Sequence, residues 1–540
     1  MMRKTWKAVA AAAVLAVGLA GCSNPGEQAE SSSAAPGEGT LRIAQAAAPD
    51  SLVPWQISST ASINIAQQVY HSLVDMTPAG EFTPYLATDW SQSTDGLSWT
   101  FNLRDDVYWQ TGNDLFGDEK VPVTAQDVKF SYDFILDPAN QARHYDNLVK
   151  LIDSVEVVDD HTVTFNLKKV GSLLLFRLSK VRIFPERGIK KNWDFKAYPV
   201  GSAAYKFKEH VKDDHLTLER NEDYWLKPGV KEVEFRFIAD QSVAAIALQN
   251  GEVDVALNVN PTDAAQITEA NGLELVSAGL GNPNLFTFNF DDPLLSDVKV
   301  RTALAQAVDA DAIITAAYKN NAGIEVAKRG FSPLPPERAG YDAVATSAVT
   351  PQFDPQAAAR SLEDLGWKKN EAGFYAKGGD TLAFEIKVSN SDANKEKVAV
   401  VTATQLQAFG VDAKVTTVEN GTFIADSEAG DTQLSIFSGY DGPAASTQVM
   451  HTQDKHNPNN GYSNPDVDAL LDEAWTVTLD ERKRSDQIRE ATVKFASDVP
   501  YLFAYYVYSQ VGVSERVEDF DEYPTLEFAL SSSSRNVTVR

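Results

Sequence analysis

The sequence predicts a mixed α/β fold that is divided into more than one lobe. Segments in which apolar and polar residues alternate recur from residue 40 onward, and a period of two is typical of strands with one buried face. Between these segments lie apolar stripes with helical spacing and recognisable ends. The chain has 540 residues, which is more than one hydrophobic core usually holds, so two or more lobes are expected.

The first 21 residues are expected to form a secretory signal. Three basic residues near the start precede an apolar run from Ala8 to Ala20, which is too short to span a bilayer as a permanent helix. Leu19-Ala20-Gly21-Cys22 resembles a bacterial lipobox. The resemblance implies that Cys22, the only cysteine, is acylated and becomes the first mature residue. The alternative is an ordinary secretory signal with a coincidental cysteine.

Residues 22–39 are expected to form a disordered tether. After Cys22 they are small or polar, with no aromatic and no large aliphatic residue, so the segment cannot bury enough apolar surface to fold. Such a tether would hold the body near the membrane while the acyl chains of Cys22 sit in the lipid, where two chains suffice for stable attachment.

Several strands follow from the alternation of apolar residues. Their apolar positions are Trp99, Phe101 and Leu103; Val163, Phe165 and Leu167; Val233, Phe235 and Phe237; Phe286, Phe288 and Phe290; and Leu382, Phe384, Ile386 and Val388.

Three helices have readable ends. Thr124 is expected to cap one, with Asp127 at its third position, where a carboxylate meets free amides and the positive end of the helix dipole. Asp354-Pro355 begins a second helix, which stops at Gly366. Asn464-Pro465 begins a third, with an apolar stripe on one face.

The chain is strongly acidic. Its formal net charge is −27, and loss of the signal with its three basic residues changes this to −30. Such a field repels nucleic acid and anionic head groups, so neither is expected as a partner. After the signal no run of eighteen apolar residues occurs, and we expect the body to lie outside the membrane.

An ordered series of motifs runs through the chain. It begins with Asp95-Gly96, Trp99-Thr100-Phe101-Asn102-Leu103-Arg104, Trp109, Thr124-Ala125 and Asp127-Val128, and continues with Pro199-Val200-Gly201, Tyr205, Arg220-Asn221, Asp223-Tyr224-Trp225, Val300-Arg301 and Gly461-Tyr462-Ser463-Asn464-Pro465. The series resembles the bacterial extracellular solute-binding proteins, family 5, which include oligopeptide- and dipeptide-binding lipoproteins of ABC importers. The resemblance covers Leu41 to about Tyr508 and departs at Ser202-Ala203-Ala204, where the family commonly has Thr-Gly-Pro.

The resemblance implies a two-lobed periplasmic-binding-protein-like fold of the class II or cluster C type, with a hinge and a ligand cleft between the lobes. Lobe one would comprise residues 40–280 plus 501–540, and lobe two residues 281–500. Gly279-Leu280-Gly281 and Val499-Pro500-Tyr501 are the expected crossings. Hinge closure around a ligand would create the form that a membrane permease distinguishes.

The resemblance also suggests ligand contacts. In peptide-binding relatives a tryptophan followed closely by an aspartate pairs with the ligand amine. Here Tyr440 would take the tryptophan position and Asp441 would be the carboxylate, although Asp441-Gly442-Pro443 is also a plain turn sequence. Trp55, Tyr505 and Tyr506 are further candidates, for which core packing is the alternative interpretation.

Catalytic motifs are missing from the sequence. It contains no GxSxG, Walker, GxGxxG or HExxH motif, and the spacing of His210 with His215 and of His451 with His456 does not suit a metal site. We therefore expect no catalytic residue, metal or cofactor, although paired carboxylates in a cleft leave no such motif.

The expected protein is a receptor that is lipid-anchored on the extracytoplasmic face of the cell membrane, monomeric, and able to pass short peptides to an ABC permease. An oligosaccharide, a siderophore-like compound or a metal chelate is the alternative ligand. A peptide sensor, a chaperone-like surface protein or a hydrolase on the same scaffold is the alternative from another functional class.

Overall fold

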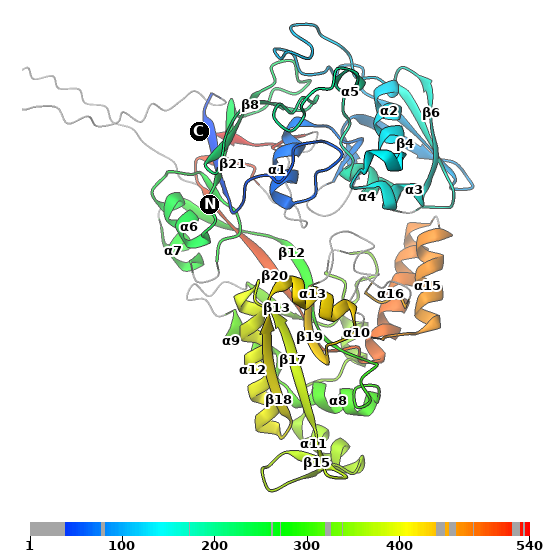
Figure 1. Cartoon of the computed structure of the whole chain (residues 1–540), viewed down its shortest axis with the longest axis vertical. Coiled ribbons are helices and arrows are strands. Elements are labelled where there is room, and N and C mark those ends of the chain that lie inside the picture. The colour runs from blue at the N-terminus through cyan, green and yellow to red at the C-terminus, as the bar shows by residue number, and fades with distance from the viewer. Residues whose placement is uncertain are drawn as a thin grey trace, which may run out of the picture.

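The computed structural model describes residues 38–540 except 77–81, 172, 261–262, 271, 319–325, 337, 439–448, 453–460, 479, 521–529 and 533–534. The expected signal, Cys22 and nearly all of the tether lie outside these residues. The chain forms two lobes joined by two long strands, β12 (Leu273–Phe288) and β20 (Tyr501–Ser514) (Figure 1). Within the described ranges no helix is long and apolar enough to cross a membrane.

Lobe one, the upper lobe in Figure 1, contains the elements from β1 to α7 and the last four strands. Its strands are β1 (Thr40–Gln45), β2 (Val74–Met76), β3 (Phe82–Pro84), β4 (Ala87–Gln92), β5 (Ser98–Leu103), β6 (Ile152–Asp159), β7 (Thr162–Leu167), β8 (Tyr205–Val211), β9 (His215–Arg220), β10 (Glu232–Phe237), β11 (Val255–Ala256), β21 (Val517–Glu518), β22 (Ser531–Ser532), β23 (Arg535–Asn536) and β24 (Thr538–Val539). Its helices are α1 (Thr60–Val69), α2 (Ala125–Leu136), η1 (Pro138–Asn140), α3 (Tyr145–Val149), α4 (Leu174–Lys180), α5 (Glu186–Lys190), α6 (Gln241–Gln249) and α7 (Ala264–Glu269).

Lobe two contains the elements from α8 to α16. Its helices are α8 (Val298–Ala307), α9 (Ala310–Ala317), α10 (Ala343–Val349), α11 (Pro355–Asp364), α12 (Ala393–Phe409), α13 (Asn420–Glu428), α15 (Pro465–Thr476) and α16 (Glu481–Ser497). Its strands are β13 (Ala327–Gly330), β14 (Lys368–Lys369), β15 (Tyr375–Lys377), β16 (Asp380–Thr381), β17 (Ala383–Ser389), β18 (Asp412–Val418) and β19 (Leu434–Ser438).

An eleven-stranded sheet passes through both lobes in the order β18-β17-β19-β12-β20-β11-β1-β10-β9-β8, with β13 also paired to β20. The pairs β1–β10, β17–β18 and β17–β19 are parallel. Helices connect parallel strands and cover the sheet, as this class of sheet requires. The mixed α/β fold is confirmed.

A separate four-stranded sheet, β4-β5-β7-β6, lies in lobe one. Phe101 and Phe165 project from adjacent strands with ring centroids 5.5 Å apart, and Tyr132 of α2 packs on Phe165 at 4.7 Å. All three side chains are fully buried, so the apolar face that the alternation predicts packs against α2.

The predicted helix ends are confirmed. Thr124 and Asp127 form a capping box, in which the Thr124 amide donates to Asp127 Oδ2 over 2.9 Å. The strand expected to reach Phe290 ends at Phe288 instead. Asn289 ends it, because its side-chain oxygen accepts from the Asp291 amide and turns the chain.

The strands β12 and β20 pair with each other from Leu273 opposite Ser514 to Thr287 opposite Tyr501. The register shifts on both sides of Leu280, within the glycine-containing segment where a crossing is predicted. Residues 504–507 of β20 pair with β13 of lobe two, whereas residues 512–513 pair with β11 of lobe one. The strand β20 thus pairs with strands of both lobes, and the exact lobe boundaries stay a prediction.

Candidate functional site

A cavity of about 480 Å³ lies where the two lobes meet. Lobe one contributes Gln241 at the start of α6 and the loop Asn258–Asn260. Lobe two contributes the N-terminal end of α12 and the end of β19, and residues 507–510 of β20 complete the wall. Figure 1 shows α6 and α7 above α12, beside the two connecting strands.

The order of the strands explains why polar residues gather here. β17 and β19 are parallel neighbours, with Lys387 opposite Ser435, so their carboxyl ends meet at one edge of the sheet. Ligands of open α/β sheets bind outside the carboxyl ends of the strands. Ser391 and Asp392 follow β17, and Ser438 is the last residue of β19. All three side chains line the cavity.

Asp392 and Lys395 place opposite charges in this cavity. Asp392 caps α12, and its Oδ1 accepts from the amides of Asn394 and Lys395 at 2.9 and 3.3 Å. The Lys395 ammonium donates to Ser438 Oγ, which donates in turn to Asn284 Oδ1 over 2.9 Å. Burial lowers the pKa of Lys395, and nearby Asp392, 3.9 Å away, acts in the opposite direction.

The cavity therefore offers binding groups of several kinds. Its wall carries one ammonium, one carboxylate, six amide side chains, among them those of Asn258, Asn284 and Gln510, and the rings of Tyr318 and Tyr508. This set suits a ligand with both charges and hydrogen-bonding groups. No group of three or more His, Cys, Asp or Glu that could hold a metal occurs in the part of the chain that the structure describes.

Tyr440 and Asp441 lie outside the described residues, within 439–448. Ser438, which lines the cavity, precedes Tyr440 by two positions. The structure thus describes the strand that leads to the predicted pair, and the ligand role of the pair stays a prediction.

Trp55 packs within lobe one. Its ring centroid lies 4.8 Å from that of Phe134, 5.0 Å from Phe184 and 5.7 Å from Phe195. It is half-buried against this core, and it is not among the residues that line the interlobe cavity. Core packing accounts for its position, and its ligand role remains a prediction.

Tyr505 and Tyr506 are neighbours on β20 and point to opposite faces of the sheet. Tyr505 is fully buried, 5.9 Å from the ring of Tyr318, which lines the cavity, so it lies directly behind the cavity wall. Tyr506 is 1% exposed, and its hydroxyl lies 3.0 and 2.8 Å from the carbonyl oxygens of Ser332 and Leu334. Packing explains both positions, and direct ligand contact by either residue stays a prediction.

The sequence reasoning did not select Asp392 and Lys395. A usable signal was present, because Ser389–Asp392 is the polar run that directly follows the predicted strand ending near Val388. What the sequence did not supply is the pairing of β17 with β19, which brings Lys395 to Ser438 across 43 positions of the chain.

Comparisons with known proteins agree with this architecture. A family profile described as bacterial extracellular solute-binding proteins, family 5 middle, matches residues 81–461. The oligopeptide-binding protein AppA of Bacillus subtilis is 25% identical over 540 residues, which cover 95% of each chain. Among solved structures, HbpA2 from Haemophilus parasuis has a TM-score of 0.79 at 24% identity, covering 93% of this chain and all of that one.

Another solved structure is NikZ from Campylobacter jejuni, described in complex with Ni(L-His). It has a TM-score of 0.70 at 26% identity and covers 89% of this chain and 94% of that chain. The similar proteins therefore include a protein named for oligopeptides and one seen with a metal chelate.

Proposed function

Because the chain belongs to the bacterial extracellular solute-binding proteins, family 5, we propose that it captures short peptides between its lobes and delivers them to the permease of an ABC importer. The observation that carries the peptide assignment is the ammonium of Lys395 in the interlobe cavity, beside the strand β19 that leads to the predicted carboxylate of Asp441. A free peptide is a zwitterion, and a buried terminus that stays unpaired is costly. Lys395 would receive the peptide carboxylate.

Asp441 is proposed as the partner of the peptide ammonium, with Tyr440 beside it as a wall residue. Both follow Ser438, whose hydroxyl already bonds Lys395. Asp392 is a less suitable partner for the ammonium, because its Oδ1 is occupied by the α12 cap. Closure of the lobes around the ligand would produce the form that the permease recognises.

The first alternative ligand is a metal chelate. NikZ, at 26% identity, is described with Ni(L-His), and the carboxylate of such a chelate could use the same Lys395 ammonium. Peptides and amino-acid chelates thus share the group that this cavity recognises, and the test must include both.

We further propose that the mature chain begins at an acylated Cys22, acts at the extracytoplasmic face of the membrane as a monomer, and does not catalyse a reaction. The support for the anchor is the lipobox sequence Leu19-Ala20-Gly21-Cys22. Replacing Cys22 with Ser should move the protein from the membrane fraction to the soluble fraction after secretion. Retention of the Cys22→Ser variant in membranes would contradict the anchor.

A thermal-shift screen tests the ligand. The mature chain with Cys22→Ser is mixed with separate pools of di- to hexapeptides, oligosaccharides and metal chelates. A ligand at a hundred times its Kd stabilises the folded state by about 2.7 kcal/mol, which raises the melting temperature measurably. A shift with peptides supports the proposal, whereas shifts with chelates or sugars and none with peptides contradict the peptide assignment. Mass spectrometry of the bound pool should find intact peptides, and cleavage products would indicate an enzyme.

A further inference from the structure

A second cavity, of about 570 Å³, lies entirely on lobe one. Its walls are the loop Gln110–Asp114, the segment from Lys191 to Val200 after α5, and residues 206–208 of β8 with Glu219 of β9. In Figure 1, α5 and β8 lie at the end of lobe one that is farthest from lobe two. The proposed transport function does not use this cavity.

Aromatic rings form one side of the cavity. Trp193 Nε1 donates to the carbonyl oxygen of Tyr198 over 2.7 Å, and the two ring centroids are 6.2 Å apart. Tyr198 also meets Phe207 edge to face at 6.3 Å. The Tyr198 side chain is 59% exposed, so a large aromatic surface is held in place and left open to solvent.

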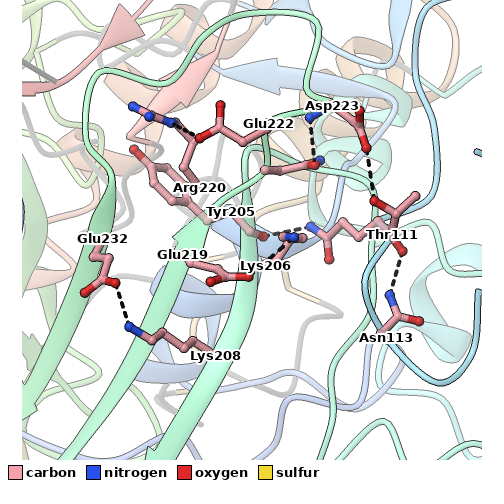
Figure 2. Close-up of polar contacts among 12 residues, drawn as sticks. Thr111, Asn113, Tyr205, Lys206, Lys208, Glu219, Arg220, Glu222, Asp223 and Glu232 are labelled. Atoms are coloured by element: carbon pink, nitrogen blue, oxygen red, sulfur yellow. Dashed lines mark hydrogen bonds and ion pairs between the residues drawn. The ribbon is translucent and has the colours of Figure 1, made fainter. Parts of the chain in front are cut away.

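Charged side chains also line the cavity. Lys206 Nζ lies 3.3 Å from Glu219 Oε1, and Lys208 Nζ lies 2.6 Å from Glu232 Oε1 (Figure 2). An ammonium has three donors and a carboxylate has about four acceptor positions, so these pairs retain hydrogen-bonding capacity.

The positive and negative side chains that line the cavity are equal in number. Three lysines line it, together with three carboxylates, those of Asp114, Asp194 and Glu219. An anionic or a cationic ligand would add an unbalanced charge, whereas a neutral ligand with many hydroxyl groups can accept from the lysines and donate to the carboxylates.

The edge of the large sheet also borders this cavity, because β8 is the last strand in its order. The carbonyl oxygen of Tyr205 accepts a hydrogen bond from Gln110 Nε2 over 2.7 Å and so points away from β9. Backbone groups alternate in direction along a strand, so the carbonyl of Phe207 also points to the edge of β8 that faces away from β9. Addition of a peptide strand is nevertheless disfavoured. A bulge between Phe207 and Glu209 interrupts the register, and edge lysines such as Lys206 and Lys208 oppose strand pairing.

We infer that this cavity binds a neutral sugar ring. The C–H groups on one face of a pyranose carry partial positive charge and pack on the negative faces of aromatic rings, here Trp193 and Tyr198. The ring hydroxyls then bond Lys206 and Glu219, which also line the cavity. The ligand is an uncharged saccharide, and its site is independent of the interlobe cavity.

Saturation-transfer NMR and titration with maltotriose, cellotriose and N,N′-diacetylchitobiose test the inference, using the mature chain with Cys22→Ser. At least one saccharide should bind. Tyr198→Ala removes a mostly exposed ring and should weaken binding about three- to tenfold, as expected for loss of one aromatic contact. Tyr198→Phe keeps the ring and should retain binding.

Phe353→Ala is the matched control, because Phe353 is an exposed aromatic residue of lobe two, 47% exposed. It should leave saccharide binding unchanged, and Tyr198→Ala should leave peptide binding unchanged. Failure of all three saccharides to bind overturns the inference, as does binding that Tyr198→Ala does not weaken. Trialanine binding that is lost in Tyr198→Ala, without saccharide binding, would assign the cavity to peptides and also overturn it.

Discussion

Replacement of Arg301 tests which contacts stabilise the junction between α16 and β20. Its side chain is 3% exposed and lies over the ring of Phe290 at 4.0 Å. The guanidinium donates to the carbonyls of Leu295 and Ser296 at 2.7 and 3.0 Å. It also donates to those of Asp498 and Val499 at 2.6 and 3.0 Å. One side chain thus joins the start of α8 to the end of α16.

Arg301→Met keeps most of the volume of the side chain and removes all four hydrogen bonds. Hydrogen bonds to charged groups contribute about 1.5–3 kcal/mol each, and the four bonds share one guanidinium, so their effects do not add. The free energy of unfolding is expected to fall by roughly 3–5 kcal/mol, because the four carbonyl oxygens that accept from Arg301 lose their hydrogen-bond donors. Arg301→Lys should recover part of this loss, since an ammonium can reach some of the same oxygens.

Urea unfolding measures the loss, and amide hydrogen exchange locates it. Exchange should accelerate first at residues 295–301 and 498–502, where the four carbonyls lie. Arg360→Met is the control, because Arg360 is exposed on α11. If the free energies of unfolding of Arg301→Met and Arg360→Met lie within about 1 kcal/mol of each other, the stabilising role assigned to the four hydrogen bonds of Arg301 is refuted.

Three further predictions concern other parts of the chain. Asp441→Asn should weaken peptide binding roughly 10- to 100-fold in a calorimetric titration, and unchanged affinity would remove Asp441 from the site. Burial lowers the pKa of His71 to about 3, below its ordinary value of 6.5. Between these two pH values the unfolded chain binds the proton more readily than the folded chain, so the free energy of unfolding falls as the pH decreases from about 6.5 to 3. His71→Asn should therefore reduce the pH dependence of the unfolding free energy between about pH 4 and 6 by up to about 1.4 kcal/mol per pH unit, and an unchanged slope in urea titrations would contradict the buried neutral imidazole. Gly201→Ala places a Cβ against the backbone carbonyl of Val69 and should lower the free energy of unfolding in urea by about 3 kcal/mol. A urea midpoint equal to that of the unmodified chain would show that the backbone shifts at little cost.

Much of the fold was predictable because its signals are local. Alternation located β5, β7, β10 and β17, and side-chain caps located the starts of α2, α11 and α15. The departure at Ser202 from the family pattern also has a structural account, although it involves a residue distant in sequence. Its hydroxyl lies 2.8 Å from His71 Nδ1, and the side chain is buried.

The interior of β20 was less predictable. Tyr501 to Tyr506 form a continuous run without polar residues, and such a run does not show which face meets a ligand. In the structure all six residues are buried. The strand packs against two hydrophobic clusters, with Phe503 and Tyr505 in one and Ala504 in the other, so its aromatic residues become core.

The interlobe site depends on contacts between distant segments. Lys395, Ser438 and Asn284 come from three elements whose neighbourhood is set by strand order, which no local pattern encodes. Sequence reasoning reached the segment that follows Ser438 through a family resemblance and did not reach Lys395.

The most direct test of the central claim is a calorimetric cycle on the interlobe cavity. The tightest-binding peptide of two to six residues is titrated, as the free acid and as its C-terminal amide, into the mature chain, Lys395→Met and Lys397→Met. Lys397 lies one half-turn further along α12 and is exposed, so it is a matched control. If Lys395 holds the peptide carboxylate, Lys395→Met and amidation should each weaken binding roughly 10- to 100-fold, and together no more than either alone. Lys397→Met should bind as the unmodified chain does. Equal affinities for acid and amide, or full affinity in Lys395→Met, would contradict the account.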